Sequence, residues 1–247
     1  MKYLIVNGDD FGISRGINRG IMEAYHRGIL TSTSLIVNTP ASEDAAWLSR
    51  DLPRLSVGLH VNFADSAGEP VIDLTDPGNC RDELHRQFRR FQELMGCLPT
   101  HLDSHHNAHR DPTLLPYFLV LARQYHLPLR EHCPVRYFSK FYGKWDGASH
   151  LEQISMESLA RMLETEVQEG YTELSCHPGY IDAEFQSSYS IEREAELQTL
   201  CDPSIREALV ERQIQLISFR DLGSVLMDLP SLRESLWPPL LSHPATS

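Results

Sequence analysis

The sequence predicts an α/β fold in which short buried strands alternate with amphipathic helices. The chain has 247 residues, which is within the range of one α/β barrel. Residues 3–6 form a short apolar run typical of a strand buried on both faces, and residues 16–27 then show the apolar stripe of a helix that ends at Gly28. Because this order repeats along the chain, we expect a parallel sheet with its active site at the carboxyl ends of the strands.

The remaining elements follow in the same order, with one catalytic domain expected over residues 1–229 and a loosely docked tail over 230–247. Further strands are expected at residues 29–37, 55–59, near 100, 128–130, 172–176 and 214–219. Further helices are expected at residues 41–49, 81–94, 112–125, 156–168, 189–209 and 221–227. A long Gly-, Pro- and Asp-rich loop at residues 65–81 is expected to cover a substrate.

Composition and charge argue against several partners and compartments. The formal net charge of -12 makes nucleic acid or an anionic membrane a poor main partner. No stretch is apolar enough to span a bilayer, and the first apolar run stops after Val6, which is too short for a secretion signal. The five cysteines include no CxxC pair, which is typical of a reducing compartment. We therefore expect a cytoplasmic protein.

Residues 100–109 are the most unusual stretch, with four imidazoles and one carboxylate in the order Thr-His-Leu-Asp-Ser-His-His-Asn-Ala-His. If the segment leaves a strand near Thr100, then His101, Asp103 and His105 point to one face. Neutral imidazole is the commonest protein ligand for transition metals, and a carboxylate adds the charge that holds a divalent cation. The alternative interpretation is an exposed polar loop that is His-rich by chance.

Two adjacent carboxylates, Asp9 and Asp10, follow the first strand. A helix N-cap would explain one of them, because Asp10 and Ser14 both precede the first helix. It would not explain the pair, or the flanking glycines that let backbone approach closely. Two like charges at the end of a buried strand are costly unless a cation compensates them, so the pair indicates a metal site.

Two further histidines, His60 and His177, come directly after expected strands. A lone histidine at a strand end is more often structural than a ligand, but the strand-to-helix order places both on the rim that carries the aspartate pair. Cys176 is interpreted as a small buried hydrophobe and not as a nucleophile, because alternation points it away from His177.

Together these residue types suit a mononuclear divalent metal site with open positions. The protein would supply one carboxylate and two imidazoles, and water and substrate would take the rest. The second aspartate is then available to take a proton from water, and a separate histidine to protonate a leaving group.

Two segments allow alternative interpretations. Residues 136–150 are rich in aromatic side chains, which either pack a long loop or form a surface on which a sugar ring stacks. The sequence favours neither. Residues 192–197, Glu-Arg-Glu-Ala-Glu-Leu, are interpreted mostly as the solvated face of a helix, with Arg193 as the member able to reach the rim.

The motifs together resemble those of the YdjC-like carbohydrate deacetylases, over residues 4 to about 222. The resemblance rests on VNGDDFGIS, GILTSTSLIVN, VGLHVN, PTHLDSHHNAH, ELSCHPGY and EREAELQTL. It implies a distorted (β/α) barrel of the polysaccharide-deacetylase type. It also implies an enzyme, a carbohydrate deacetylase that hydrolyses N-acetyl groups of sugars with a divalent metal. Magnesium is the metal usually given for the family, with zinc or another transition metal as the alternative.

Carried over by motif, the resemblance implies that Asp10, His60 and His105 bind the metal. Asp9 then resembles the catalytic base and His177 the general acid, although which aspartate takes which role is left open. The family commonly reads His-His-His-Val-His where this chain has His-His-Asn-Ala-His at 105–109, a departure that spares His105.

The remaining candidates are expected to contact substrate: Arg130, His101, Asp103, His109 and Tyr180. For His101 and Asp103, orientation of a ligand imidazole is a second predicted role. The chain is short between His60 and Thr100, where relatives often carry a longer insertion, so its rim loop is expected to differ from theirs.

The leading hypothesis is a metal-dependent hydrolase that removes acetyl groups from an N-acetylated sugar or a short chitooligosaccharide-like chain. That sugar is the expected partner, and neither nucleic acid nor a membrane is expected to bind. The oligomeric state is left open, with a homodimer as one alternative. One alternative is metal-assisted hydrolysis of a phosphoester, for which only Arg130, Arg136 and Lys140 offer positive charge near the rim. The other alternative is a non-catalytic sugar-binding relative.

Overall fold

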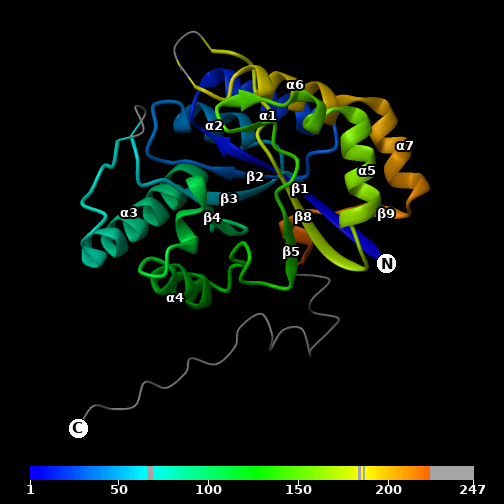
Figure 1. Cartoon of the computed structure of the whole chain (residues 1–247). Coiled ribbons are helices and arrows are strands. Elements are labelled where there is room, and N and C mark those ends of the chain that lie inside the picture. The colour runs from blue at the N-terminus through cyan, green and yellow to red at the C-terminus, as the bar shows by residue number, and fades with distance from the viewer. Residues whose placement is uncertain (66–68, 183–184, 186, 223–247) are drawn as a thin grey trace.

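The computed structural model describes residues 1–65, 69–182, 185 and 187–222. Its centre is a curled sheet with the strand order β4-β3-β2-β1-β8-β5, in which β9 also pairs with β1 (Figure 1). Every strand pair described in this sheet is parallel. The α/β fold predicted from the sequence is therefore confirmed.

Strands alternate with helices along most of the chain. The strands are β1 (Lys2–Phe11), β2 (Ser32–Leu35), β3 (Ser56–Val61), β4 (Leu102–Ser104), β5 (Val135–Phe138), β6 (Lys144–Trp145), β7 (Ala148–Ser149), β8 (Gly170–Cys176) and β9 (Ile214–Leu216). The α-helices are α1 (Arg15–Arg27), α2 (Ser42–Ser49), α3 (Pro77–Met95), α4 (Leu115–Tyr125), α5 (Met156–Glu166), α6 (Ile191–Cys201) and α7 (Pro203–Glu211). Two 3-10 helices are η1 (His105–Arg110) and η2 (Leu151–Ile154).

One segment of chain joins the two edges of the curled sheet. Leu102 in β4 donates its N–H to the Pro128 carbonyl, 2.8 Å away, and its carbonyl accepts the N–H of Arg130 at 3.0 Å. Val135 then begins β5 at the opposite edge. Residues 128–130 are thus a bridge along β4, not the separate strand that was predicted. The segment places Arg130 inside the molecule, where the residue is 1% exposed.

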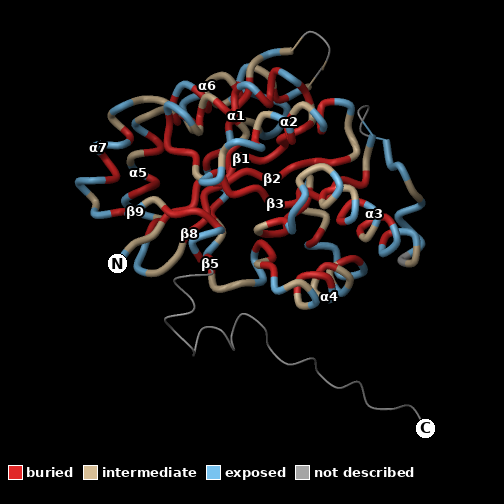
Figure 2. Tube along the Cα trace, turned by 180° about the vertical axis from the view of Figure 1, so that it is seen from behind, coloured by how far each residue is buried: buried red, intermediate tan, exposed pale blue. Residues whose placement is uncertain are grey.

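The central strands are buried on both faces, as the apolar run at residues 3–6 predicts. Leu4, Ile5 and Val6 have no exposed surface. Figure 2 shows buried residues following the strands, whereas exposed residues follow the outer sides of the helices. In α1, for example, Ile17 and Ile21 are one turn apart and both belong to the core. Leu4 and Val6 thus belong to the main core with α1, whereas Ile5 belongs to a second cluster with Val135, Ile217, Phe219 and Leu222.

Several element boundaries differ from the prediction for identifiable reasons. The helix expected at residues 189–209 is two helices, because Asp202 caps α7 and Pro203 cannot continue α6. α3 begins before residue 81 because the Asp76 side chain accepts the N–H of Gly78. The segment 136–150 contains the antiparallel pair β6 and β7. Most of the predicted helix 221–227 and the whole tail 230–247 lie outside the described residues.

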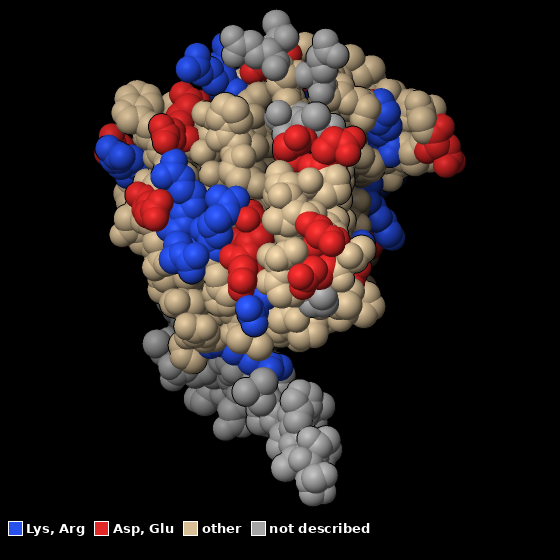
Figure 3. Space-filling view, turned by 90° about the vertical axis from the view of Figure 1, so that its left-hand side faces the viewer, with Lys and Arg blue, Asp and Glu red and all other residues tan. Residues whose placement is uncertain are grey.

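The described surface carries charges of both signs. Figure 3 shows a cluster of Lys and Arg side chains on one face, bordered by Asp and Glu side chains. Ion pairs connect neighbouring helices, such as Arg90 of α3 with Glu43 of α2 at 2.8 Å. Among the described residues, no helix is both long and apolar enough to cross a membrane. The five cysteines, all within the described part, are free thiols.

A close backbone contact places the loop after β8 on α1. A Cβ atom on Gly20 would lie 2.4 Å from the Cα atom of Gly179. The Gly179 N–H also donates to the carbonyl of Arg193 on α6, 3.2 Å away. Glycine is therefore required where these three segments meet, two residues after His177.

We expect Gly20→Ala to destabilise the protein by about 1–3 kcal/mol, the range for overpacking a dense contact. The added methyl group must displace backbone, because its nearest neighbours are backbone atoms of Gly179. Urea denaturation measures the change. Arg15→Ala, at an exposed position of the same helix, is the control and should change the free energy of unfolding by less than about 0.5 kcal/mol. Equal stability of the two variants would contradict the contact.

Candidate active site

A β-bulge brings the two adjacent aspartates to the same cavity. Neighbouring residues of a regular strand point to opposite faces. Near the carboxyl end of β1 the pairing with β2 shifts register, and Asp10 has a φ of 72°. Asp9 and Asp10 consequently both line the cavity. Asp10 is not the helix cap considered as an alternative, since Ser14 caps α1.

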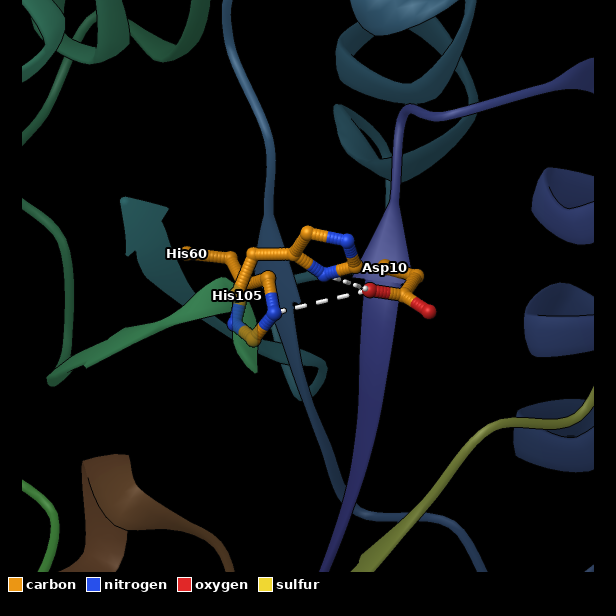
Figure 4. Close-up of side chains that lie close together, drawn as sticks. All are labelled: Asp10, His60 and His105. Atoms are coloured by element: carbon orange, nitrogen blue, oxygen red, sulfur yellow. Dashed lines mark ion pairs between the residues drawn. The ribbon is translucent and has the colours of Figure 1, made fainter. Parts of the chain in front are cut away.

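Asp10, His60 and His105 converge from three elements of the fold (Figure 4). The Asp10 Oδ1 atom lies 3.0 Å from His105 Nδ1 and 3.5 Å from His60 Nε2. One ligand atom from each residue lies within 4.8 Å of the other two. Asp10 Oδ1 is buried, and no hydrogen-bond partner for it is found among the described residues. This donor set fits a divalent cation, which would satisfy the buried oxygen.

Asp103 fixes the orientation of His60. β3 and β4 pair these two residues in register, and Asp103 Oδ1 lies 2.7 Å from His60 Nδ1. His60 Nε2 is therefore the nitrogen that faces Asp10. Burial alone would lower the pKa of His60, but the surrounding carboxylates of Asp103, Asp10 and Asp9 outweigh burial and raise it to about 10. A bound divalent cation would balance the same excess of negative charge.

Arg130 adjoins this cluster and pairs with three carboxylates. Its guanidinium donates to both oxygens of Asp9, at 2.7 and 2.8 Å, and makes two hydrogen bonds to Glu173, at 2.6 and 2.9 Å. It also lies 2.9 Å from Asp103 Oδ2. Burial would lower the pKa of Arg130, but these carboxylates raise it well above its usual value. One guanidinium therefore holds together the charged side chains of β1, β4 and β8.

The three carboxylates differ in how far Arg130 offsets their burial. Burial would raise the pKa of each carboxyl group. At Asp9 and Asp103 the positive charge of Arg130 outweighs burial and lowers the pKa. At Glu173 burial prevails and raises the pKa to about 7. Asp9 is thus ionised at neutral pH, and Asn7 Nδ2 donates a further hydrogen bond to it at 2.8 Å.

His177 lines the same cavity directly after β8. Its backbone N–H donates to Glu196 Oε2 on α6, and its Nδ1 atom lies 3.8 Å from Glu196 Oε1. The Tyr189 hydroxyl donates to that same Oε1 atom. Burial would lower the pKa of His177, but the Glu196 carboxylate raises it above the usual 6.5. The ring therefore keeps its proton to a higher pH than free imidazole does.

α6 is not the solvated helix face that the sequence predicted. Glu192 and Glu196 have no exposed surface, and Arg193 is 6% exposed. Arg193 donates to Asp10 Oδ2 at 2.6 Å and to the His177 carbonyl at 3.2 Å. The prediction was wrong because charges at helical spacing usually face water, whereas these pair with polar groups at the strand ends. As a result, Oδ1 is the Asp10 oxygen that faces the imidazoles.

These groups border one cavity of about 520 Å³. All five residues predicted to carry the chemistry line it: Asp9, Asp10, His60, His105 and His177. The aromatic segment 136–150 divides between two places. Tyr137 and Tyr142 line the cavity, whereas Phe138 and Phe141 are buried in the core. The segment therefore contributes both to packing and to the cavity wall.

Comparison with known proteins identifies the family. Residues 3–211 match the family model described as YdjC-like protein. The chain belongs to the YdjC-like family. A carbohydrate deacetylase from Geobacillus stearothermophilus is 37% identical over 89% of this chain and 98% of that protein. A chitooligosaccharide deacetylase from Salmonella heidelberg (strain SL476) is 35% identical over 90% of this chain and 99% of that protein. The resemblance seen in the motifs is thus confirmed, and with it the assignment to a family of carbohydrate deacetylases.

Solved structures share the fold of this YdjC-like chain. An Enterococcus faecalis V583 protein, provisionally named as a cellobiose-phosphate cleavage protein, has a TM-score of 0.74 and 29% identity over 90% of this chain and 98% of that chain. A family 4 acetyl xylan esterase from Clostridium thermocellum, in complex with a cobalt ion, has a TM-score of 0.52 and 13% identity over 91% of both chains. The second similarity shows the fold alone. The predicted polysaccharide-deacetylase type of α/β fold is confirmed.

The residues predicted to contact substrate in this YdjC-like protein do not line the cavity: Arg130, His101, Asp103, His109 and Tyr180. The first four are at most 1% exposed. Arg130 is buried because residues 128–130 pair with the edge of β4, and His101 is buried because its ring packs on Phe219. Asp103 has instead the second role predicted for it, since it orients His60.

Besides Arg130 and Asp103, whose contacts are described above, the other three of these residues also have structural partners. The His101 ring stacks on Phe219, with centroids 3.9 Å apart. His109 Nδ1 lies 2.6 Å from the Ser104 hydroxyl oxygen, which also accepts the His109 N–H, so this pair holds η1 against the end of β4. The Tyr180 hydroxyl donates to a carboxylate of α1.

Four polar residues near the site were not singled out from the sequence: Asn7, Glu173, Tyr189 and Glu196. Glu173 has the same strand parity as Ser175 and His177, so alternation along β8 could have identified it. Glu196 is three residues after Arg193 and shares its helix face. Asn7 bonds to Asp9 two residues along the same strand, so alternation could also have identified it, whereas no local signal marks Tyr189, whose contacts depend on the loop after β8.

We expect Arg130→Met to destabilise the protein by about 3–5 kcal/mol, the range for removing one partner of a buried ion pair. The substitution leaves the buried carboxylates of Asp9 and Asp103 without their cation. Urea denaturation at neutral pH measures the loss. Arg136→Met, at an exposed position, is the matched control. A loss below about 1 kcal/mol for Arg130→Met would show that water or another group replaces the guanidinium.

Proposed function

We propose that the protein is a metal-dependent hydrolase that removes the acetyl group from an N-acetylated sugar or short oligosaccharide. One observation carries the proposal. Asp10 Oδ1 is buried without a hydrogen-bond partner among the described residues, and it faces two imidazoles in a cavity that Asp9 and His177 also line. The relatives named carbohydrate deacetylase and chitooligosaccharide deacetylase support this reaction.

Asp10, His60 and His105 would hold the ion. A divalent cation there supplies polarisation of the amide carbonyl and lowers the pKa of a water molecule. Arg193 and Asp103 prepare the ligand atoms, because they occupy Asp10 Oδ2 and His60 Nδ1 and leave the other atom of each side chain free. Two imidazoles favour a transition ion such as zinc or cobalt, whereas the family resemblance implies magnesium.

Asp9 is proposed as the base that takes a proton from water in the cavity. Its lowered pKa keeps it ionised at neutral pH. Arg130 and Asn7 hold both of its oxygens in place, so the carboxylate cannot rotate away from the cavity. Position then compensates for the weak basicity that a low pKa implies.

His177 is proposed as the acid that donates a proton to the nitrogen of the leaving amine. Glu196 raises its pKa, which favours the protonated ring that can donate the proton. The bond from the His177 backbone N–H to Glu196 also fixes the loop that carries the ring. An amine leaves readily only after its nitrogen is protonated, so this proton is needed for the amide bond to break.

The cavity does not favour the phosphoester alternative. Of the three basic residues that this alternative requires, Arg130 is buried among carboxylates. Arg136 and Lys140 do not line the cavity. A phosphate group would therefore lack the side-chain cations that usually hold it.

Acetate release from di-N-acetylchitobiose tests the proposal. We expect the metal-replete protein to release acetate, a chelator to stop the release, and one divalent ion to restore it. Magnesium, zinc and cobalt are added back in turn to identify that ion. His105→Ala should lose both the activity and calorimetric binding of the ion, because one imidazole ligand is gone. Failure to release acetate from any N-acetylated sugar would refute the proposal.

His177→Ala separates catalysis from binding. We expect it to lower kcat by roughly 10²–10⁴, the contribution of a general acid, and to leave binding of the ion unchanged. Lys140→Ala, which alters an exposed side chain outside the cavity, is the control. A protein that binds the sugar equally well with or without His177, and never turns it over, would instead be the non-catalytic relative.

The pH profile of kcat/KM should reflect His177 on its alkaline side. The protonated ring is the active form, so the rate is expected to fall as the pH rises through a pKa above 6.5. Glu196→Gln removes the carboxylate that raises this pKa, and the alkaline limb should then move to lower pH. Because the pKa of Asp9 is lowered, a decline on the acid side is expected to reflect loss of the ion as its imidazole ligands are protonated, and not protonation of Asp9. An unchanged alkaline limb in Glu196→Gln would assign that limb to another group.

A further inference from the structure

The turn that begins at His105 has an unusual backbone. In η1, His106 and Asn107 follow this residue in the left-handed region, with φ values of 52° and 54°. Non-glycine residues rarely adopt such values, and they keep them where surrounding contacts hold the chain. His105, His106 and Asn107 all line the cavity, so contacts that hold this turn also place the imidazole that is proposed to bind the ion.

Ser104 and His109 join the two ends of the turn. The Ser104 hydroxyl oxygen accepts the His109 N–H at 2.9 Å and lies 2.6 Å from His109 Nδ1. Burial lowers the pKa of His109 to about 4, so the ring is neutral and carries one proton. Its other nitrogen, Nε2, lies 3.4 Å from a carboxylate oxygen of Glu131. A carboxylate only accepts hydrogen bonds, so this arrangement favours the proton on Nε2 and leaves Nδ1 to accept the Ser104 hydroxyl.

Glu131 also bonds to Arg110, the last residue of η1. Its carboxylate accepts two hydrogen bonds from that guanidinium, at 2.6 Å from Nε and 3.0 Å from Nη2. Burial would raise the pKa of Glu131, but Arg110 outweighs burial and lowers it, so the carboxylate is ionised. Two parallel bonds to one carboxylate fix its direction as well as its distance. Glu131 has a φ of 63°, so a third non-glycine residue in the left-handed region belongs to the same set of contacts.

Glu131 directly follows Arg130, and these neighbours bond to different parts of the site. Arg130 donates to both oxygens of Asp9. Glu131 holds η1, which begins with His105. The residue that orients the proposed base and the residue that holds the turn of a proposed ligand are therefore joined by a single peptide bond, whose length and planarity are fixed.

We infer that Glu131 is a positioning residue that links the turn carrying His105 to the segment carrying Arg130. Through this link, the imidazole proposed to bind the ion keeps a fixed place relative to Asp9. The inference rests on the proposed function and assigns a role outside the cavity, because Glu131, His109 and Arg110 do not belong to its described lining. Loss of the link should weaken ion binding although every proposed ligand is intact.

Ion binding by the metal-free protein tests this link, with zinc, cobalt and magnesium titrated in turn by calorimetry. We expect Glu131→Gln to raise the Kd of the ion that binds by about fivefold, which corresponds to about 1 kcal/mol, the upper value for a partly exposed ion pair. Arg110→Met should give a similar increase, and the double variant should bind no more weakly than either, because the two side chains act as one unit. Glu43→Gln, which breaks an exposed ion pair with Arg90 of α3, is the matched control and should leave the Kd unchanged.

Hydrogen exchange at the His109 amide measures the turn itself in the ion-free protein. That N–H donates to Ser104 across the turn, so it exchanges when the turn opens. We expect exchange to be about fivefold faster in Glu131→Gln, the same free-energy change as for the ion, and unchanged in Glu43→Gln. Exchange at the wild-type rate in Glu131→Gln, or an unchanged Kd for the ion, would overturn the inference and leave the deacetylase function standing.

Kinetics with di-N-acetylchitobiose at saturating ion complete the test. We expect Glu131→Gln to lower kcat by at least about threefold and to change KM by less than about twofold, because the side chain lies outside the cavity and acts on alignment. A raised KM with unchanged kcat would contradict the inference, since the change would then reach the sugar alone. If the wild type releases no acetate while the Kd and the exchange rate change as expected, the deacetylase function fails and the link stands.

Discussion

The active-site end of this fold depends on the buried guanidinium of Arg130. Asp9, Asp103 and Glu173 come from three different strands, and each would be costly to bury alone. A guanidinium has several N–H groups in one plane, so it can bond to carboxylates on more than one side, which a lysine ammonium cannot do with the same geometry. The segment that pairs with the edge of β4 delivers this group, so the position of that segment and the ionisation of Asp9 depend on the same contacts.

The bulge at Asp10 is the second constraint, and it stores strain at the site. A non-glycine residue at φ 72° costs about 1–3 kcal/mol, although aspartate tolerates this region better than most residues. This backbone conformation is maintained because Arg193 of α6 donates a hydrogen bond to Asp10 Oδ2. As a result, two consecutive carboxylates reach one cavity with different partners: Arg130 bonds to Asp9, and Asp10 presents its Oδ1 atom to two imidazoles.

The sequence predicted which residues meet at the cavity better than it predicted the contacts that hold these residues in place. Asp9, Asp10, His60, His105 and His177 could be grouped because the carboxyl ends of parallel strands meet at one edge of a sheet, whatever the details of packing. The bulge could not be predicted, because a strand pattern implies that adjacent residues point apart and nothing local signals the exception.

Burial of charged residues was the other failure of prediction. Glu192 and Glu196 have the spacing of an ordinary solvated helix, and only the tertiary fold shows that they are buried; Arg193 does reach the rim, as the sequence suggested. Arg130 was placed near a substrate for the same reason, since a charged residue in a sequence carries no sign of the carboxylates that will surround it. Short-range patterns therefore located residues that line the cavity, whereas the groups that hold those residues depend on contacts between distant segments.

α6 explains how Asp10, His177 and Tyr142 can keep a fixed spacing although they come from different segments of the chain. Arg193 bonds to Asp10 and to the carbonyl of His177, and Glu196 bonds to the N–H of His177. One turn earlier, Glu192 pairs with Lys144, close in sequence to Tyr142. A shift of α6 would move His177 and the segment that carries Tyr142 together. The bond from Arg193 to Asp10 resists that shift. Apolar side chains on α6 would pack equally densely, but they would not fix the orientation of His177. The proposed proton transfer from His177 to a bound amide depends on that orientation.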